Sequence, residues 1–195
     1  WTFSDSLERG GKKWRTQRPW FAPGNPNNLG FNANYASTGT KNLWGFDRQG
    51  VSFPHSKRGK ARDYSVRTKK KVKVPQHRSS FLRFRHAYFF DNHVRGKRVR
   101  NFDGGRVEYS RNGKKWSDLM RGQYPNKVWG KSTASLRGQK AYAGESAGYR
   151  TVVKKFPKKL RGKKVFIRFK ISSDNTPYIL HFGWFIDDIG VGRCR

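Results

Sequence analysis

Cationic side chains recur at every second position in one short stretch, "DYSVRTKKKVKVP" at residues 63–75. Because successive side chains of a β-strand point to opposite faces, these cations would form a row on one face, spaced by about 6.6 Å. The row consists of Arg67, Lys69, Lys71 and Lys73. A regular row of cations suits a repeating polyanion, whose condensed counterions are released on binding. The spacing therefore predicts a polyanion-binding surface.

Two further stretches alternate in the same way, "SFLRFRHAYFF" at residues 80–90 and "KKVFIRFKIS" at residues 163–172. If these strands lie beside the first one, their cations extend the same basic face: Arg83, Arg85, Lys164, Arg168 and Lys170. Such a face predicts an acidic polysaccharide, a nucleic acid or a cell-wall polymer as partner. The alternatives are a solvated charged face without a ligand, an acidic protein partner, or a second copy of the chain.

Two adjacent acids, Asp187 and Asp188, lie within the apolar stretch "HFGWFIDDIGVG" at residues 181–192. Carboxylates can bind a hard cation such as calcium, which takes about six to eight oxygen ligands. In a regular strand the two side chains would point to opposite faces. We therefore expect one acid to face loops or a metal ion, and the other to accept backbone N–H groups or pair with an arginine.

The chain as a whole is strongly basic, with 44 Lys+Arg against 12 Asp+Glu and a formal net charge of +32. Self-repulsion on this scale opposes the compact state and favours anionic partners. The five histidines lack the H-E-x-x-H spacing of zinc proteases. Asp103 and Glu108 are spaced like a possible glycosidase pair, but they flank a Gly-Gly turn that we interpret as structural. We predict that the domain is not an enzyme.

Aromatic residues in loop-like stretches offer a different kind of site. Trp20, Tyr124 and Trp129 lie in stretches rich in Gly, Asn or Pro, where an exposed ring could stack on a sugar or a base. If they do, the protein is a neutral carbohydrate-binding module and its charge is incidental. This is a third interpretation, beside the polyanion-binding module and the structural subunit of an extracellular assembly.

Short alternating runs separated by Gly, Asn and Pro dominate the chain, and helical periodicity is almost absent. This pattern predicts an all-β sandwich or barrel with long loops. Residues 104–119 read as a hairpin, because Asn112-Gly113 is a strong turn signal. His86 shares the parity of apolar neighbours and is predicted to be a core histidine. We expect one domain over residues 1–195, and no apolar run is long enough to span a membrane.

Several stretches resemble a known family, notably "FDGGRVEYS", "NGKKWSDL" and "GWFIDDIGV". The chain resembles the jelly-roll accessory domain found with immune inhibitor A-type metallopeptidases and, more distantly, the MAM domains of animal cell-surface proteins. The resemblance implies a two-sheet antiparallel jelly-roll sandwich, a secreted or cell-surface location and a non-catalytic role beside an enzyme or adhesin. It also implies a structural calcium site formed by four acids: Asp5, Asp47, Asp187 and Asp188. This chain has Ser4 where MAM-like domains often have Glu.

Overall fold

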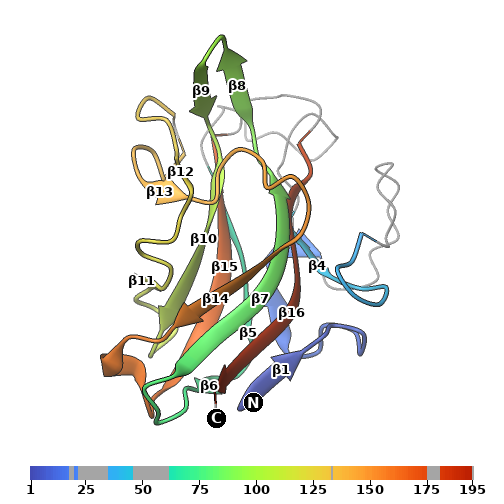
Figure 1. Cartoon of the computed structure of the whole chain (residues 1–195), viewed down its shortest axis with the longest axis vertical. Helices are drawn as coiled ribbons and strands as arrows, with labels where there is room; N and C mark the ends of the chain where they lie inside the picture. Colours follow the sequence, from blue (N-terminus) through green and yellow to red (C-terminus); the bar gives the residue numbers. More distant parts are fainter. Residues whose placement is uncertain (18–19, 22–34, 46–61, 133, 175–180, 195) are drawn as a thin grey trace.

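The structure is a computed structural model, and it describes residues 1–17, 20–21, 35–45, 62–132, 134–174 and 181–194. Its regular elements are β-strands, apart from the short 3-10 helix η1 (Lys158–Leu160) (Figure 1). The all-β prediction is therefore confirmed. In these ranges no helix is long and apolar enough to cross a membrane.

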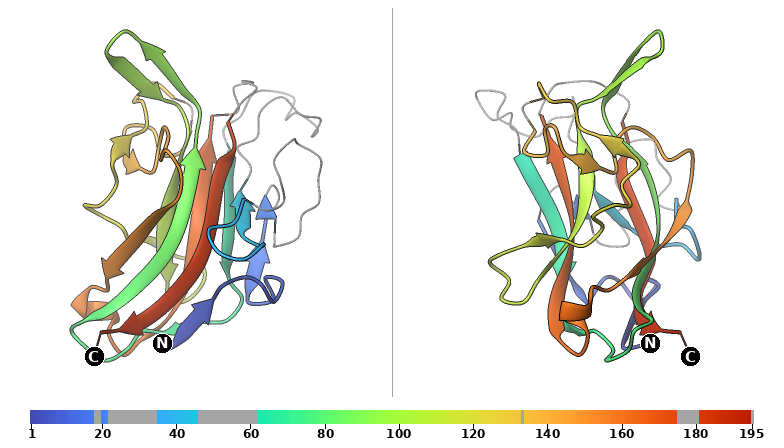
Figure 2. Two further views of the ribbon diagram at one scale, coloured as in Figure 1. Left: turned by 45° about the vertical axis from the view of Figure 1, so that its right-hand side comes forward. Right: turned by 60° about the vertical axis from the view of Figure 1, so that its left-hand side comes forward.

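Two six-stranded antiparallel sheets face each other, and the right-hand view of Figure 2 separates them. The first sheet has the order β14 (Arg150–Lys155), β7 (Ser80–Phe89), β16 (Gly183–Arg193), β4 (Leu43–Gly45), β3 (Trp20–Phe21). Strand β1 (Phe3–Asp5) also pairs with β16 in this sheet. The long strands β7 and β16 thus form its centre.

The second sheet has the order β11 (Ser117–Asp118), β10 (Gly104–Ser110), β15 (Lys164–Ser173), β5 (Arg62–Thr68), β2 (Trp14–Thr16). Strand β6 (Val72–Lys73) also pairs with β15. Two small ladders complete the described elements: β8 (Asn92–Arg95) with β9 (Arg98–Asn101), and β12 (Asn126–Lys127) with β13 (Lys140–Ala141). The sandwich prediction is confirmed, whereas the jelly-roll topology and the single domain remain predictions.

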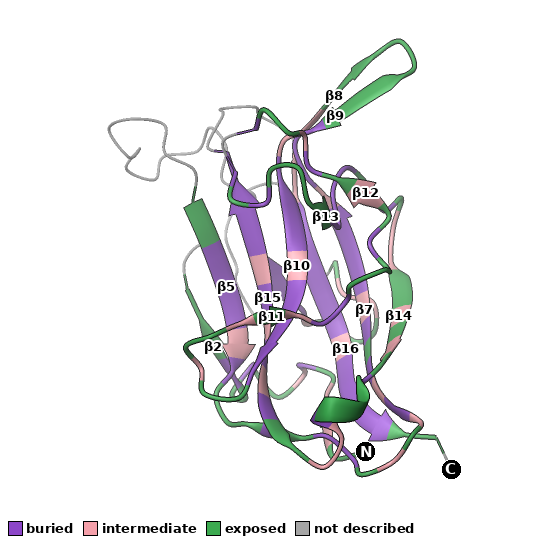
Figure 3. Cartoon of the chain, turned by 90° about the vertical axis from the view of Figure 1, so that its left-hand side faces the viewer, coloured by how far each residue is buried: buried purple, intermediate pink, exposed green. Residues whose placement is uncertain are grey.

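The core lies between the sheets (Figure 3). It consists mainly of the apolar side chains that occupy alternate positions along the strands. Phe84 of β7 and Phe169 of β15 are both fully buried, and their rings meet edge to face with centroids 5.3 Å apart. Trp184 of β16 packs edge to face on the same Phe169 ring at 5.7 Å. Burying one such side chain stabilises the fold by roughly 1.5–3 kcal/mol. The apolar side chains that the sequence predicts to point inward therefore form the interface between the two sheets.

The predicted hairpin at residues 104–119 is confirmed, since β10 pairs with β11 through Tyr109 and Ser117. Its loop is longer than a two-residue turn. The Asn112 side-chain oxygen accepts the N–H groups of Lys114 and Lys115, and Gly113 adopts a φ of 76°. The Asn-Gly pair thus shapes a wider loop in which the asparagine side chain replaces missing backbone acceptors.

Candidate anion-binding site

An irregularity in the second sheet creates a strongly basic pocket. Strand β15 pairs first with β6, where Lys164 faces Lys73, and then with β5, where Arg168 faces Arg67. Six residue steps separate Arg67 from Lys73. Their partners on β15, Arg168 and Lys164, are separated by only four steps. Two extra residues therefore bulge from the sheet, and the predicted unbroken row of cations is wrong at Lys69 and Lys71.

The bulge is stabilised from within and from outside the sheet. Thr68 is 1% exposed, and its hydroxyl accepts the N–H of Ile167 at 3.2 Å, which replaces a backbone acceptor in the ladder. Next along the chain, the N–H of Lys69 donates to the carbonyl of Lys13 at 2.8 Å. The bulge is thereby fixed against the segment that enters β2. Bulges of this kind commonly redirect side chains at functional sites.

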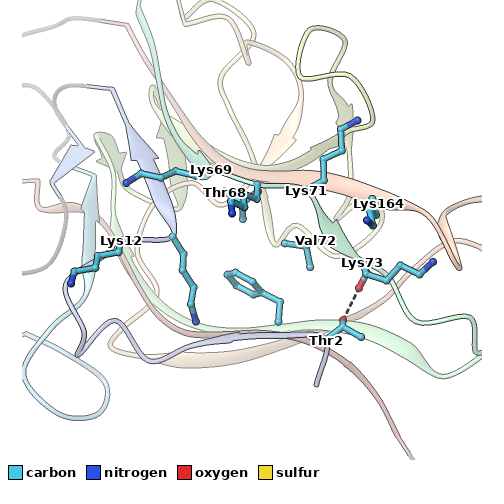
Figure 4. Close-up of a pocket in the computed structure, with 11 residues that line it drawn as sticks. Thr2, Lys12, Thr68, Lys69, Lys71, Val72, Lys73 and Lys164 are labelled. Atoms are coloured by element: carbon cyan, nitrogen blue, oxygen red, sulfur yellow. Dashed lines mark hydrogen bonds between the residues drawn. The ribbon is translucent and has the colours of Figure 1, made fainter.

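The pocket has a volume of about 480 Å³ and lies where β1 of the first sheet meets the bulge of the second (Figure 4). Figure 4 shows Lys12 and Lys69 on one side of the hollow and Lys73 and Lys164 on the other, with Val72 between them. Seven of its 11 described lining residues are lysines, and none is acidic. The lysines are Lys12, Lys13, Lys69, Lys70, Lys71, Lys73 and Lys164.

Strand β1 holds the other wall of the pocket. The Thr2 hydroxyl donates to the carbonyl of Lys73 at 2.6 Å, which joins the N-terminal segment to β6. Phe3 packs edge to face against Trp14 with ring centroids 5.9 Å apart, and the ammonium group of Lys13 lies 5.4 Å from the centre of the Phe3 ring. An apolar floor thus underlies the cationic rim.

The electrostatics of this pocket favour an anion. Two like charges about 10 Å apart repel by about 0.4 kcal/mol even in water, and seven lysines sum many such pairs. No carboxylate among the described lining residues relieves this repulsion. A lysine ammonium is a compact charge on a flexible stem, so the rim can adapt to anionic groups at several positions. The arrangement can bind anions.

The structure brings together four of the nine predicted polyanion-binding residues, namely Lys69, Lys71, Lys73 and Lys164. Sequence reasoning missed Lys12, Lys13 and Lys70. The doublet Lys12-Lys13 in "GGKKW" was the available signal, but nothing local to it indicates that it faces the bulge. Its position depends on the pairing of β2 with β5, where Trp14 lies opposite Thr68.

Three further predicted cations lie on the outer face of the same sheet, but two of them have acidic partners. Arg168 pairs with Glu108 at 2.5 Å and covers the Trp116 ring at 4.1 Å. Lys170 lies 3.1 Å from Asp63. Arg67 instead lies 4.9 Å from the centre of the Phe166 ring. This part of the face therefore carries less uncompensated charge than the pocket.

The prediction that Arg83 and Arg85 extend this basic face is wrong. Both belong to β7, which pairs with β14 and β16 in the first sheet and not with β15 or β5. Their parity points them outward, as predicted, but on the opposite side of the sandwich. Arg85 lies 3.8 Å from Asp188. Alternation along one strand defines its faces, and it does not define which strand lies beside it.

The adjacent acids of β16 bind the segment before β4. One extra residue bulges between Asp187 and Gly190, and Asp188 adopts a φ of 48°. Asp187 is fully buried and accepts the N–H groups of Ser37, Thr38 and Asp188 at 2.9, 3.1 and 2.7 Å. Burial raises the pKa of Asp187, and these donors oppose the shift.

The expectation that these two side chains point to opposite faces is wrong. Asp188 accepts the Thr38 hydroxyl at 2.9 Å, so the bulge turns both carboxylates toward the same segment. Asp187 accepts backbone N–H groups and Asp188 lies beside Arg85, so both acids have partners that we expected for only one of them.

The calcium site implied by the family resemblance remains a prediction. Asp5 uses one carboxylate oxygen for the Leu7 N–H and the other for the Trp14 indole N–H, both at 3.0 Å. Asp47 lies outside the described residues. Within the described ranges no three His, Cys, Asp or Glu residues gather in a way that could hold a metal ion.

Two of the three predicted stacking residues are buried, so the prediction is wrong for them. Trp20 is 2% exposed and packs on Trp184, with ring centroids 6.0 Å apart. Tyr124 is 7% exposed, and its hydroxyl donates to Asp118 at 2.8 Å. Trp129 is half-buried, and the Arg100 guanidinium lies 4.9 Å from its ring centre. Turn-rich sequence surrounds all three, but sandwich loops also bury aromatic rings.

Residues that could suggest catalysis have structural roles. Asp103 is fully buried and accepts the N–H of Asp174 at 2.7 Å. The stretch "GESAG" at residues 144–148 matches the G-x-S-x-G pattern, a match that our sequence reasoning missed. A nucleophile elbow needs an exposed serine between a strand and a helix. Ser146 is 2% exposed instead, and its hydroxyl accepts the Tyr88 N–H at 2.9 Å.

In comparisons with known proteins, no protein-family model matches this chain, and no curated protein matches it either. The family resemblance seen in the sequence therefore remains a prediction.

Proposed function

We propose that this chain is a non-catalytic β-sandwich module that binds polyanions through the lysine-lined pocket. One observation carries the proposal: seven lysines from three separate chain segments converge on a hollow whose described lining residues include no acid. An acidic polysaccharide and a nucleic acid backbone share the chemistry that this pocket recognises, which is a series of closely spaced anionic groups.

The pocket supports anion binding better than neutral sugar binding. Neutral sugars are held by exposed aromatic platforms and directional polar groups, whereas Trp20 and Tyr124 are buried in the core. Lysines supply strong charge but little directional recognition. We therefore place the alternative of a neutral carbohydrate-binding module second.

The proposal extends to the biological setting. The resemblance to accessory domains of immune inhibitor A-type metallopeptidases favours an extracellular or cell-surface module, and the two antiparallel sheets are compatible with it. In that setting an acidic polysaccharide or extracellular nucleic acid is accessible to the pocket. An acidic surface on a neighbouring protein would present similar chemistry, and it would compete with a soluble polyanion for the same lysines.

The test measures binding of a fluorescent heparin oligosaccharide by anisotropy over a range of salt concentrations. With about five anionic contacts, affinity should fall several hundred-fold between about 50 and about 200 mM salt. The variant K69Q/K71Q/K73Q removes three exposed lysines of the pocket. It should bind at least about tenfold more weakly at low salt, with a salt slope reduced by about three.

The matched control is K114Q/K131Q/K158Q, which removes three exposed lysines outside the pocket. We expect its affinity to change by no more than about threefold and its salt slope to remain near that of the unmodified protein. If both triple variants lose the same affinity and the same slope, the charge acts diffusely and the pocket is not the site.

A further inference from the structure

A second cationic element stands apart from the pocket, at the opposite end of the sandwich. Strands β8 and β9 form a hairpin that projects beyond the two sheets, whereas β1, β6 and both chain termini lie at the other end (Figure 1). The same separation is visible in both views of Figure 2. All residues from His93 to Arg100 are exposed. The hairpin is therefore accessible to a large ligand along most of its length.

The hairpin has two chemically different faces. Residues directly opposite in an antiparallel pair share a face, so Arg95 and Arg98 lie together, as do His93 and Arg100. These four residues line a shallow pocket of about 280 Å³. The other face carries Val94 opposite Val99, a cross-strand pair of the kind that stabilises an isolated ribbon.

The cationic face is unfavourable for the hairpin itself. Like charges placed directly opposite each other destabilise a strand pair, and Arg95 opposite Arg98 is such a pair. No acid occurs in residues 92–101. Gly96 adopts a φ of 58° at the first position of the tight turn, and Lys97 adds a further cation there. An anionic ligand would relieve the repulsion that the sequence creates.

The cations of the hairpin differ in type from those of the pocket. All cationic residues that line the pocket are lysines, whereas the cationic face of the hairpin carries three arginines. A planar guanidinium can donate two parallel hydrogen bonds to a phosphate or to the O6 and N7 atoms of guanine. At the base of the hairpin, Arg100 lies 4.9 Å from the centre of the Trp129 ring, which anchors that side chain.

We propose that the β8–β9 hairpin is a DNA-binding ribbon that enters the major groove of a duplex with its arginine face toward the base edges. The major groove is about 12 Å wide and about 8.5 Å deep, and it admits a two-stranded β-ribbon. The major groove of A-form RNA is too narrow for the same element. The hairpin supplies both the shape and the guanidinium groups that this mode of binding requires.

This inference goes beyond the proposed function, because it assigns a separate site and a single class of polyanion. The lysine pocket would contact any dense polyanion, while the hairpin would distinguish duplex DNA from heparin and from RNA. The two sites use different residues at opposite ends of the molecule, so variants of each report on one proposal only.

The test uses the whole chain and a DNA duplex of about 20 base pairs, roughly two helical turns. Dimethyl sulfate methylates guanine N7 in the major groove and adenine N3 in the minor groove, so one reaction reports on both. Bound protein should protect guanine N7 and leave adenine N3 reactive. The variant R95Q/R98Q should lose this protection, and its affinity for the duplex should fall at least about tenfold.

Three comparisons complete the experiment. The control R121Q/R137Q removes two exposed arginines elsewhere and should retain N7 protection. R95K/R98K retains the charge without the guanidinium groups, and it should bind the duplex while protecting N7 less. K69Q/K71Q/K73Q should retain N7 protection while losing affinity for heparin.

The proposal is overturned if the unmodified protein does not protect guanine N7, or if R95Q/R98Q protects it equally well. It is also overturned if R95Q/R98Q loses binding to heparin or to anionic phospholipid vesicles as strongly as to DNA. The hairpin would then be a general cationic surface. The first two outcomes would leave the proposal for the lysine pocket unaffected, because that proposal is tested by its own variant.

Discussion

At the scale of single residues, His86 is a polar side chain buried in the core. It is 2% exposed, and its Nδ1 accepts the indole N–H of Trp184 at 3.1 Å, so the prediction of a core histidine is confirmed. Its ring also meets Tyr142 edge to face at 4.5 Å. Burial, with a smaller effect of Arg150, lowers the pKa of His86 to about 3. The imidazole is therefore neutral in the folded protein.

This pKa makes stability depend on pH. In the unfolded chain a histidine titrates near pH 6.5, so between about pH 6.5 and about pH 3 the unfolded state binds a proton that the folded state excludes. The contribution of His86 is complete above pH 6.5 and is lost as pH falls. Between pH 7 and about pH 4.5 we expect a loss of about 2–3 kcal/mol from this residue alone.

Chemical denaturation at both pH values checks this expectation. The variant H86Q retains an acceptor for the Trp184 N–H and cannot titrate, so its unfolding free energy should fall less on acidification by that amount. H93Q, at an exposed position of the hairpin, should fall as much as the unmodified protein. An equal fall for H86Q would show that His86 is not the group responsible.

At the scale of elements, the bulge in β16 ties a separate segment to the first sheet. Asp187 accepts the N–H groups of Ser37 and Thr38, which precede β4. An asparagine at position 187 has one acceptor oxygen and would turn its amide N–H groups toward other donors. D187N should therefore lower the unfolding free energy by about 1–3 kcal/mol. Hydrogen exchange at Ser37 and Thr38 should accelerate in parallel.

The partly exposed neighbour provides the control for this prediction. Asp188 accepts the Thr38 hydroxyl and no backbone group of that segment, so D188N should cost less than about 1 kcal/mol and leave the amide exchange of Ser37 unchanged. Similar costs for the two variants would mean that the backbone contacts of Asp187 do not anchor the segment.

The sequence predicts the core side chains of the strands but not the bulges. Two-residue periodicity correctly predicts which side chains of β7 and β15 enter the core, because parity is a local property of a strand. It predicts neither bulge, because each bulge is a mismatch in length between a strand and its partner. Thr68 stabilises one bulge by accepting a hydrogen bond from Ile167, which is distant in sequence.

The site is less predictable than the core for a related reason. The spacing of Lys69, Lys71 and Lys73 predicts that they bind an anion together. Their shared pocket, however, arises from the bulge that interrupts the strand. Lys12 and Lys13 reach the same hollow only through the pairing of β2 with β5. The condition placed on Arg83 and Arg85, that their strand lies beside β5, is not met, because strand order is a property of the whole chain.

At the scale of the whole molecule, the net charge of +32 is distributed so that two cationic features lie at opposite ends. Such a charge opposes the compact state, and the continuous core between the sheets offsets it. A bridging role follows if both proposals hold, because the pocket and the hairpin could then contact different polyanions at the same time.

The most direct measurement for the central proposal is a lysine footprint. The protein is acetylated with and without a heparin oligosaccharide, and the extent of modification at each lysine is read by mass spectrometry. We expect the seven lysines of the pocket to be protected strongly by the ligand, and Lys114, Lys131 and Lys158 to be modified as before. Uniform protection of all lysines, or protection that spares the pocket, would contradict the account.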